Sequence, residues 1–220
     1  KQQIQDRVSG VLNLQDLAGV DLVIEAVTED LRIKQNLLNE VATVVGTETP
    51  LVTNTSALSV TELAAGIDNP SRVAGLHFFN PVPLMEIVEV VKGLQTTDDL
   101  GVALEDFVGT LNKTAIPAKD RPGFLINWLL LPYLNDVIQA YDDELASAHD
   151  IDKAIRLGLG YKAGPLELLD MLGLDIHLQA TTTAYEATHA QRFAAPPLLQ
   201  QMVTAGYLGD KSDRGFRKGE

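Results

Sequence analysis

Residues 72–91 read RVAGLHFFNPVPLMEIVEVV, and this stretch carries the strongest structural and chemical signals of the chain. The apolar residues before His77 predict a strand, which the two prolines that follow cannot continue. We therefore expect His77 where a strand gives way to a loop. Side chains alternate between faces in the next predicted strand, so Glu89 shares a face with Ile87 and Val91. A carboxylate among such apolar neighbours needs a partner, because an unpaired buried charge is costly.

His77 can be that partner. A carboxylate that accepts an imidazole N–H is satisfied, and it determines which ring nitrogen stays free to act as a base. A plainer interpretation remains open, in which His77 merely ends a strand and Glu89 is an edge-strand charge like its neighbour Glu86. The spacing alone does not decide between the two.

Composition limits the classes of function. The chain has 220 residues, and its 17 basic against 30 acidic residues give a net charge of -13, which disfavours nucleic acid as a partner. Cysteine is absent, which excludes disulfides and thiolate sites and fits a reducing compartment. No apolar run is long enough to span a bilayer, and no histidines fall at metal-ligand spacing. We therefore expect no membrane partner, no metal, and a soluble cytoplasmic protein, or a mitochondrial matrix protein in a eukaryote.

Strand-like and helix-like segments alternate through the first half of the chain. This order predicts an α/β layer on a mostly parallel sheet. Ser59 is expected to cap a short helix, with Glu62 at capping-box spacing. Strands are predicted at about 21–27, 50–54, 72–77, 86–91 and 114–117, with longer helices at about 31–45 and 98–111.

The character changes after residue 120. A long apolar helix is predicted from about 123 to 141, broken or kinked at Pro132, and such a helix must be buried. We expect His149, His177 and His189 at the surface or at helix caps. Shorter helices are predicted at about 150–157, 166–172, 175–189 and 197–205. The chain is thus expected to form an α/β domain over residues 1–119 and an all-helical domain over residues 120–220.

Five blocks of sequence, in order, resemble one known family. They are DLVIEAVTEDL at 21–31, NTS at 54–56, the His77 stretch, PGFLIN at 122–127 and GPLELLD at 164–170. The whole chain resembles the NAD-dependent L-3-hydroxyacyl-CoA dehydrogenases, which include 3-hydroxybutyryl-CoA dehydrogenases. The resemblance implies a Rossmann-type NAD-binding domain followed by a helical substrate and dimerisation domain, with NAD as cofactor, an acyl-CoA substrate and a homodimer as the assembly.

The resemblance also implies roles for individual residues. His77 would be the general base for the hydroxyl at C3 of a 3-hydroxyacyl-CoA, and Glu89 would hold and polarise its imidazole. Ser56 and Asn127 match supporting residues of the family's active site. Asn127 lies on an apolar helix, so its amide should face a polar partner or a ligand. Trp128 stands where family members commonly carry arginine.

Cofactor contacts are implied in the same way. Glu29 and Lys34 match positions that line the nicotinamide-ribose side of the cleft in the family, and Asn54 and Ser56 follow at the end of the second strand. Each also has an ordinary structural interpretation. Glu29 suits a helix start, Lys34 a solvated helix face, and Ser56 a turn.

A dinucleotide fold needs a glycine-rich turn between its first strand and first helix. The segment Gly158–Ala163 matches the loose motif G-x-G-x-x-A of such a turn. It follows a predicted helix rather than a strand, so we interpret the match as a coincidence. In the family the turn belongs to a βαβ unit that would precede Lys1. We therefore expect the carboxyl-terminal portion of an NAD domain, and weak or no activity of this chain alone.

Two other functions stay open on the sequence. The chain could be a non-catalytic acyl-CoA-binding or structural dimerising module, since lens lambda-crystallin shares the same resemblance and fold does not guarantee activity. A β-hydroxyacid dehydrogenase with a lysine as acid–base group fits poorly, because it leaves the His77 stretch without a role.

Overall fold

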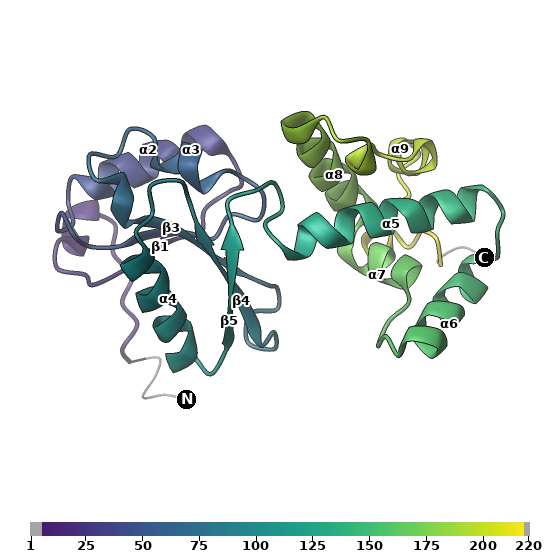
Figure 1. The fold of residues 1–220 in the computed structure, drawn as a ribbon, viewed down its shortest axis with the longest axis horizontal. Coiled ribbons are helices and arrows are strands. Elements are labelled where there is room, and N and C mark those ends of the chain that lie inside the picture. The colour runs from purple at the N-terminus through teal and green to yellow at the C-terminus, as the bar shows by residue number, and fades with distance from the viewer. Residues whose placement is uncertain (1–5, 218–220) are drawn as a thin grey trace. The chain divides into compact units, whose positions relative to one another are not determined.

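The computed structural model describes residues 6–217, and the chain divides into two compact units, Lys1–Phe124 and Leu125–Glu220. The first unit is α/β and the second is helical, as predicted. Figure 1 shows the two units with their elements labelled. No helix within residues 6–217 is long and apolar enough to cross a membrane.

The first unit is built on a five-stranded sheet in the order β1-β2-β3-β4-β5. Neighbouring strands run parallel except β3 and β4, which are antiparallel. The sheet is therefore mostly parallel, as the alternating pattern predicts. The strands are β1 (Val23–Glu25), β2 (Leu51–Thr53), β3 (Val73–Phe78), β4 (Ile87–Lys92) and β5 (Thr114–Lys119).

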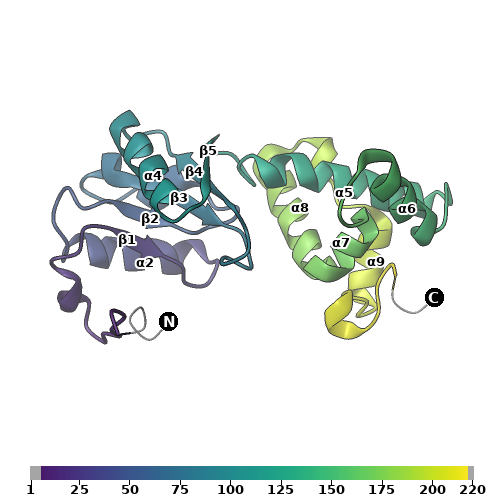
Figure 2. The same ribbon diagram turned by 90° about the horizontal axis from the view of Figure 1, so that it is seen from below.

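Helices cover both faces of this sheet. The helices α2 (Leu31–Ala42) and α3 (Val60–Ala64) pack on the face that includes Leu51, Val73 and Val91. The opposite face packs against α4 (Asp98–Thr110), and Figure 2 shows α4 and α2 on opposite sides of the strands. Short 3-10 turns at Leu14–Leu17 and Pro70–Arg72 complete the unit. Both faces of the sheet are therefore buried. Polar functional side chains are expected at the ends of the strands instead.

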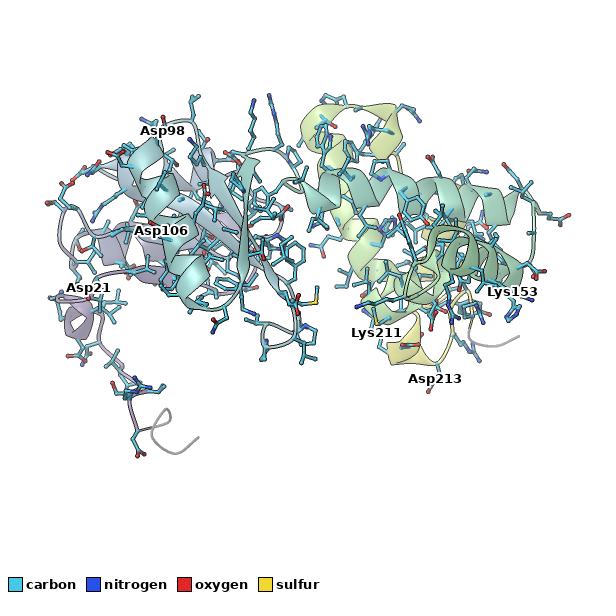
Figure 3. The ribbon with its side chains drawn as sticks, turned by 60° about the horizontal axis from the view of Figure 1, so that its bottom comes forward. Asp21, Asp98, Asp106, Lys153, Lys211 and Asp213 are labelled. Atoms are coloured by element: carbon cyan, nitrogen blue, oxygen red, sulfur yellow. The ribbon has the colours of Figure 1, made fainter. Side chains whose placement is uncertain are left out.

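Capping and amphipathic patterns explain where these helices lie. Ser59 caps α3 as predicted, since its hydroxyl accepts a hydrogen bond from the backbone N–H of Glu62 at 3.2 Å. In α4, Leu104 and Val108 face the sheet. Figure 3 labels Asp98 at the start of α4 and Asp106 further along it, and both are exposed. One stripe of α4 is thus apolar and another is charged.

The second unit consists of helices and short 3-10 turns. The long helix α5 (Ile126–Asp142) begins three residues later than predicted and is not broken at Pro132. The core of the second unit includes Leu134 and Ile138 of this helix, together with Leu166. The other elements are α6 (Ala148–Leu159), α7 (Pro165–Leu172), α8 (Leu174–Thr188), α9 (Pro197–Thr204), η3 (Gln191–Phe193) and η4 (Asp210–Ser212).

Two buried carboxylates make structural hydrogen bonds at and near the GPLELLD block. Asp152 accepts hydrogen bonds from the backbone N–H groups of Leu166 and Glu167 at the start of α7, at 2.8 and 3.0 Å. Asp170 does the same for Phe216 and Arg217, at 2.8 and 2.7 Å, and burial raises the pKa of its carboxyl. Both residues hold the helical unit together.

The prediction that His177 lies at the surface or at a cap is wrong. Its side chain is buried in α8, on the face that also carries Leu174 and Thr181. Its Nε2 lies 3.0 Å from Oδ1 of Asn135, whose Nδ2 donates to the Thr181 hydroxyl at 2.8 Å. Because this network satisfies the imidazole, the helix can bury a polar ring. His149 is exposed, and His189 caps α8, as predicted.

Burial of His177 predicts an acid-sensitive helical unit. Burial lowers the pKa of the imidazole from 6.5 to about 4, so the folded state keeps it neutral while the unfolded state takes a proton below pH 6.5. Stability is therefore lost as pH falls from 6.5 towards 4, by about 3 kcal/mol at roughly 1.4 kcal/mol per pH unit. Urea unfolding at neutral and acidic pH measures this loss. The His177→Gln variant, which does not titrate, should lose correspondingly less, and an equal loss would contradict the assignment.

Candidate active site

The antiparallel pairing of β3 and β4 brings His77 and Glu89 together. They are direct cross-strand partners, and His77 Nδ1 lies 2.7 Å from Glu89 Oε2. Both side chains are buried, at 6% and 0% exposure. The edge-strand interpretation of Glu89 is wrong, because β4 lies between β3 and β5, whereas Glu86 is exposed. A buried carboxylate at this distance orients the ring and favours the proton on Nδ1.

Two aromatic rings contact the imidazole of His77. The centroid of the Phe79 ring lies 4.4 Å away at an interplanar angle of 53°, and that of Phe124 lies 5.7 Å away at 61°. Nε2 has no hydrogen-bond partner among residues 6–217. The ring is therefore held on one side by a carboxylate and flanked by apolar groups, with its second nitrogen available to exchange a proton with a ligand.

Glu29 connects the ends of β1 and β2. Its Oε1 accepts hydrogen bonds from the Thr55 hydroxyl and from the backbone N–H groups of Ser56 and Ala57, the latter two at 2.9 and 3.3 Å. Its side chain is 39% exposed. The Ser56 side chain is also exposed. Both predicted residues therefore lie at the carboxyl ends of parallel strands, where open α/β sheets bind ligands.

Lys34 is not on a solvated helix face, which was one interpretation of its sequence position. Its side chain is 1% exposed, and Nζ lies 2.7 Å from Glu25 Oε1 and 3.4 Å from Glu29 Oε2. The Val27 carbonyl also accepts a hydrogen bond from this ammonium, at 3.2 Å. The ammonium therefore lies beneath the strand ends and fixes two carboxylates. Its partner Glu25 also accepts from the Thr53 hydroxyl at 2.6 Å.

The two predicted asparagines differ in their surroundings. Asn54 Oδ1 accepts the backbone N–H of Phe78 at 2.9 Å and so ties the end of β2 to the end of β3. Asn127 belongs to α5 in the helical unit and is half-buried. Its amide makes no side-chain hydrogen bond to any residue that the structure describes. His77, Glu89, Glu29 and Ser56 thus belong to the first unit, and Asn127 belongs to the second.

Sequence reasoning missed two residues of this site. Glu25 lies in the DLVIEAVTEDL block, but no role was predicted for it. The signal that could have found it is a carboxylate at a strand end, nine positions before Lys34. Phe124 was visible only as the apolar residue after a glycine. No group of three His, Asp or Glu residues that could hold a metal occurs in the part of the chain described.

The glycine-rich motif at Gly158–Ala163 has a structural role at a helix end. It falls at the end of α6, where Gly160 adopts a left-handed conformation with φ of 74° and caps the helix. Such a position follows a helix rather than a strand, so it is not a phosphate-binding turn.

Two protein-family models match the chain. The model described as 3-hydroxyacyl-CoA dehydrogenase, NAD binding domain, matches residues 1–121, and the model of the C-terminal domain of the same family matches residues 123–219. The first match begins at residue 1, so the prediction that the amino-terminal part of the NAD domain is missing is not borne out.

Relatives and solved structures agree with these models. The 3-hydroxybutyryl-CoA dehydrogenase of Clostridioides difficile is 38% identical over 98% of this chain and 77% of its own length. The 3-hydroxyadipyl-CoA dehydrogenase of Escherichia coli K12 is 41% identical over 95% of this chain and 44% of its own length. The crystal structure of (S)-3-hydroxybutyryl-CoA dehydrogenase from Ralstonia eutropha has a TM-score of 0.96 at 37% identity, covering 100% of this chain and 77% of that one.

The α/β unit thus corresponds to the first family model, and the helical unit corresponds to the second. The chain belongs to the 3-hydroxyacyl-CoA dehydrogenase family, with that family's NAD-binding domain in residues 1–121 and its C-terminal domain in residues 123–219.

Proposed function

We propose that this chain interconverts L-3-hydroxyacyl-CoA and 3-ketoacyl-CoA with NAD, and that His77 and Glu89 form its acid–base pair. The observation that carries the proposal is the 2.7 Å contact from His77 Nδ1 to Glu89 Oε2, which leaves Nε2 as the nitrogen for exchange. The relatives favour this function over a non-catalytic module, because they are named as dehydrogenases.

In the oxidation direction, His77 Nε2 accepts the proton of the substrate hydroxyl at C3. The Glu89 carboxylate stabilises the imidazolium that forms, since it holds Nδ1–H at hydrogen-bond distance. In the reduction direction the imidazolium returns this proton to the developing alkoxide. Bound NAD supplies the hydride acceptor, and NADH the hydride donor.

The residues at the strand ends fit a dinucleotide. Glu29 Oε1 accepts hydrogen bonds from the chain itself, whereas Oε2 contacts, among the described residues, only the ammonium of Lys34 at 3.4 Å. The side chain is 39% exposed. This oxygen can accept a hydrogen bond from a ribose hydroxyl. Lys34 would act by holding Glu29 in place. Asn54 would act in a similar way, by keeping β2 in line with His77.

Ser56 and Asn127 would be supporting donors for the oxyanion. The Ser56 hydroxyl is exposed at the end of β2, and Asn127 has an amide without a side-chain hydrogen bond to the described residues. A polar group without a protein partner is suited to a ligand. The Ser56 hydroxyl would bind the oxygen at C3 while His77 moves the proton.

The proposed activity is tested by NADH oxidation in the presence of acetoacetyl-CoA. We expect turnover with the thioester and little with free acetoacetate, because the coenzyme A portion supplies binding energy away from the reacting carbon. No NADH oxidation with either compound, from a folded chain, would contradict the proposed function.

We further propose that the chain forms a homodimer through its helical unit. The exposed apolar side chains of this unit include Leu129, Leu157, Leu159, Met171, Leu172 and Ile176, which are between 45% and 76% exposed in the single chain. A contiguous exposed apolar patch is typical of an interface, and the proposal is that these side chains contribute to one. Light scattering should give twice the mass of one chain. The Met171→Glu and Ile176→Glu changes together should shift the mass to that of a monomer, whereas Val102→Glu on α4, also exposed, should not.

A further inference from the structure

Phe124 combines two properties that rarely occur together. Its ring is 4% exposed and lies against the imidazole of His77, with centroids 5.7 Å apart. Its backbone has a φ of 52°, in the left-handed region that bulky side chains avoid. Unfavourable backbone conformations persist only where the surroundings impose them, and they cluster at functional sites.

The surroundings impose this one through the segment that leads to Phe124. Asp120, which directly follows β5, accepts hydrogen bonds from the Ser59 hydroxyl at 2.8 Å and from the backbone N–H groups of Val60 and Thr61 at 3.0 and 2.7 Å. The chain then turns, and the backbone N–H of Phe124 donates to the Arg121 carbonyl at 2.8 Å. The start of the turn is thus anchored to α3.

The preceding residue allows the turn to be this tight. Gly123 has a φ of 76°, so two consecutive residues are left-handed, and glycine adopts this conformation without steric cost. Here the backbone is constrained so that an aromatic ring lies beside the proposed base.

We propose that Phe124 is a positioning residue, which sets the plane of the His77 imidazole so that Nε2 points at the substrate while Nδ1 stays on Glu89. This proposal rests on the proposed function of His77. Phe79 lies on the same ring with centroids 4.4 Å apart, so Glu89, Phe79 and Phe124 together restrict its rotation. A small misplacement of a catalytic group can reduce the reaction rate by a large factor.

The Phe124→Leu variant tests the proposal, because leucine keeps an apolar side chain and removes the ring. We expect kcat for acetoacetyl-CoA reduction to fall about tenfold, with KM for NADH within about twofold, since the change affects the reacting group and not the cofactor contacts. The Phe124→Tyr variant keeps the ring and should retain most of the rate. If leucine prevents folding, Phe124→Met provides the same comparison with a more adaptable side chain.

A second measurement does not depend on turnover. The Nδ1–H proton of His77, held by Glu89, should give a downfield NMR signal, identified by its absence in His77→Gln. We expect Phe124→Leu to weaken or remove this signal, because a ring free to rotate exchanges its proton faster. The control is Phe216→Leu, which removes a buried ring that contacts Tyr141 in the helical unit and should leave both kcat and the signal unchanged.

The outcomes separate the two proposals. A Phe124→Leu variant with unchanged kcat and an intact Nδ1–H signal would overturn the positioning role while leaving the function of His77 in place. A fully active His77→Gln variant would overturn the proposed acid–base pair, and the NMR signal would still decide whether Phe124 holds the ring.

Discussion

The His77→Gln variant is expected to keep its fold and lose turnover by about two to four powers of ten, the range that acid–base groups provide. Glutamine is similar in length and its amide can still donate to Glu89, so the buried carboxylate at 0% exposure stays partnered. It cannot accept and return a proton near neutral pH. The loss should therefore appear in kcat for acetoacetyl-CoA reduction, with KM for NADH little changed.

Two companion variants sharpen this experiment. Glu89→Gln should also lower kcat, because an amide can orient the imidazole wrongly and does not stabilise an imidazolium, as a triad carboxylate does. Glu86→Gln is the matched control, since Glu86 is an exposed carboxylate three positions earlier and should have no effect on kcat. Equal activity of Glu86→Gln and Glu89→Gln would rule out a catalytic role for the buried carboxylate.

The Lys34→Met variant is expected to be strongly destabilised, by about 3 to 5 kcal/mol in the free energy of unfolding, the cost of breaking a buried ion pair from one side. Methionine fills similar space but leaves the carboxylate of Glu25, at 1% side-chain exposure, without its cation. Urea unfolding followed by circular dichroism measures the loss in the first unit.

Two further variants identify the cause of that loss. Adding Glu25→Gln to Lys34→Met should restore part of the stability, because a neutral amide in the same place no longer carries a buried charge. Lys92→Met removes a lysine whose partner Asp98 is 91% exposed, and it should change stability far less. A Lys34→Met chain as stable as the wild type would show that the pair contributes nothing.

The contact between His77 and Glu89 could be predicted because it depends on a short-range rule. Alternation of side chains along β4 puts Glu89 among apolar neighbours, and the prolines after His77 end β3 at a hairpin-like connection. The order of strands and helices followed from the same alternation. Element ends shifted by a few residues, as at α5, because Gly123 and Phe124 use a left-handed turn that the apolar pattern does not show.

The burial of Lys34 and His177 was not predicted, because each depends on partners from another element. The pattern of α2 shows where its apolar stripe lies, but not that Glu25, which ends β1, and the Val27 carbonyl would contact Lys34. His177 needs Asn135, which lies on another helix. A polar residue on the apolar stripe of a helix therefore indicates a buried hydrogen-bond network only when the residue that would bond to it is known.

The reversal of direction between β3 and β4 has a consequence for how this protein could be altered. The pair His77 and Glu89 is held by the register of two strands, with Val88 and Val90 of β4 buried on the opposite face. A slip of one residue would exchange those faces, so the hydrophobic pattern keeps the pair aligned. The intervening residues 79–86 do not contribute to that register. A different loop could be grafted between Phe79, which contacts the imidazole, and Glu86, whose carbonyl accepts the backbone N–H of Thr114, while the carboxylate partner stays opposite.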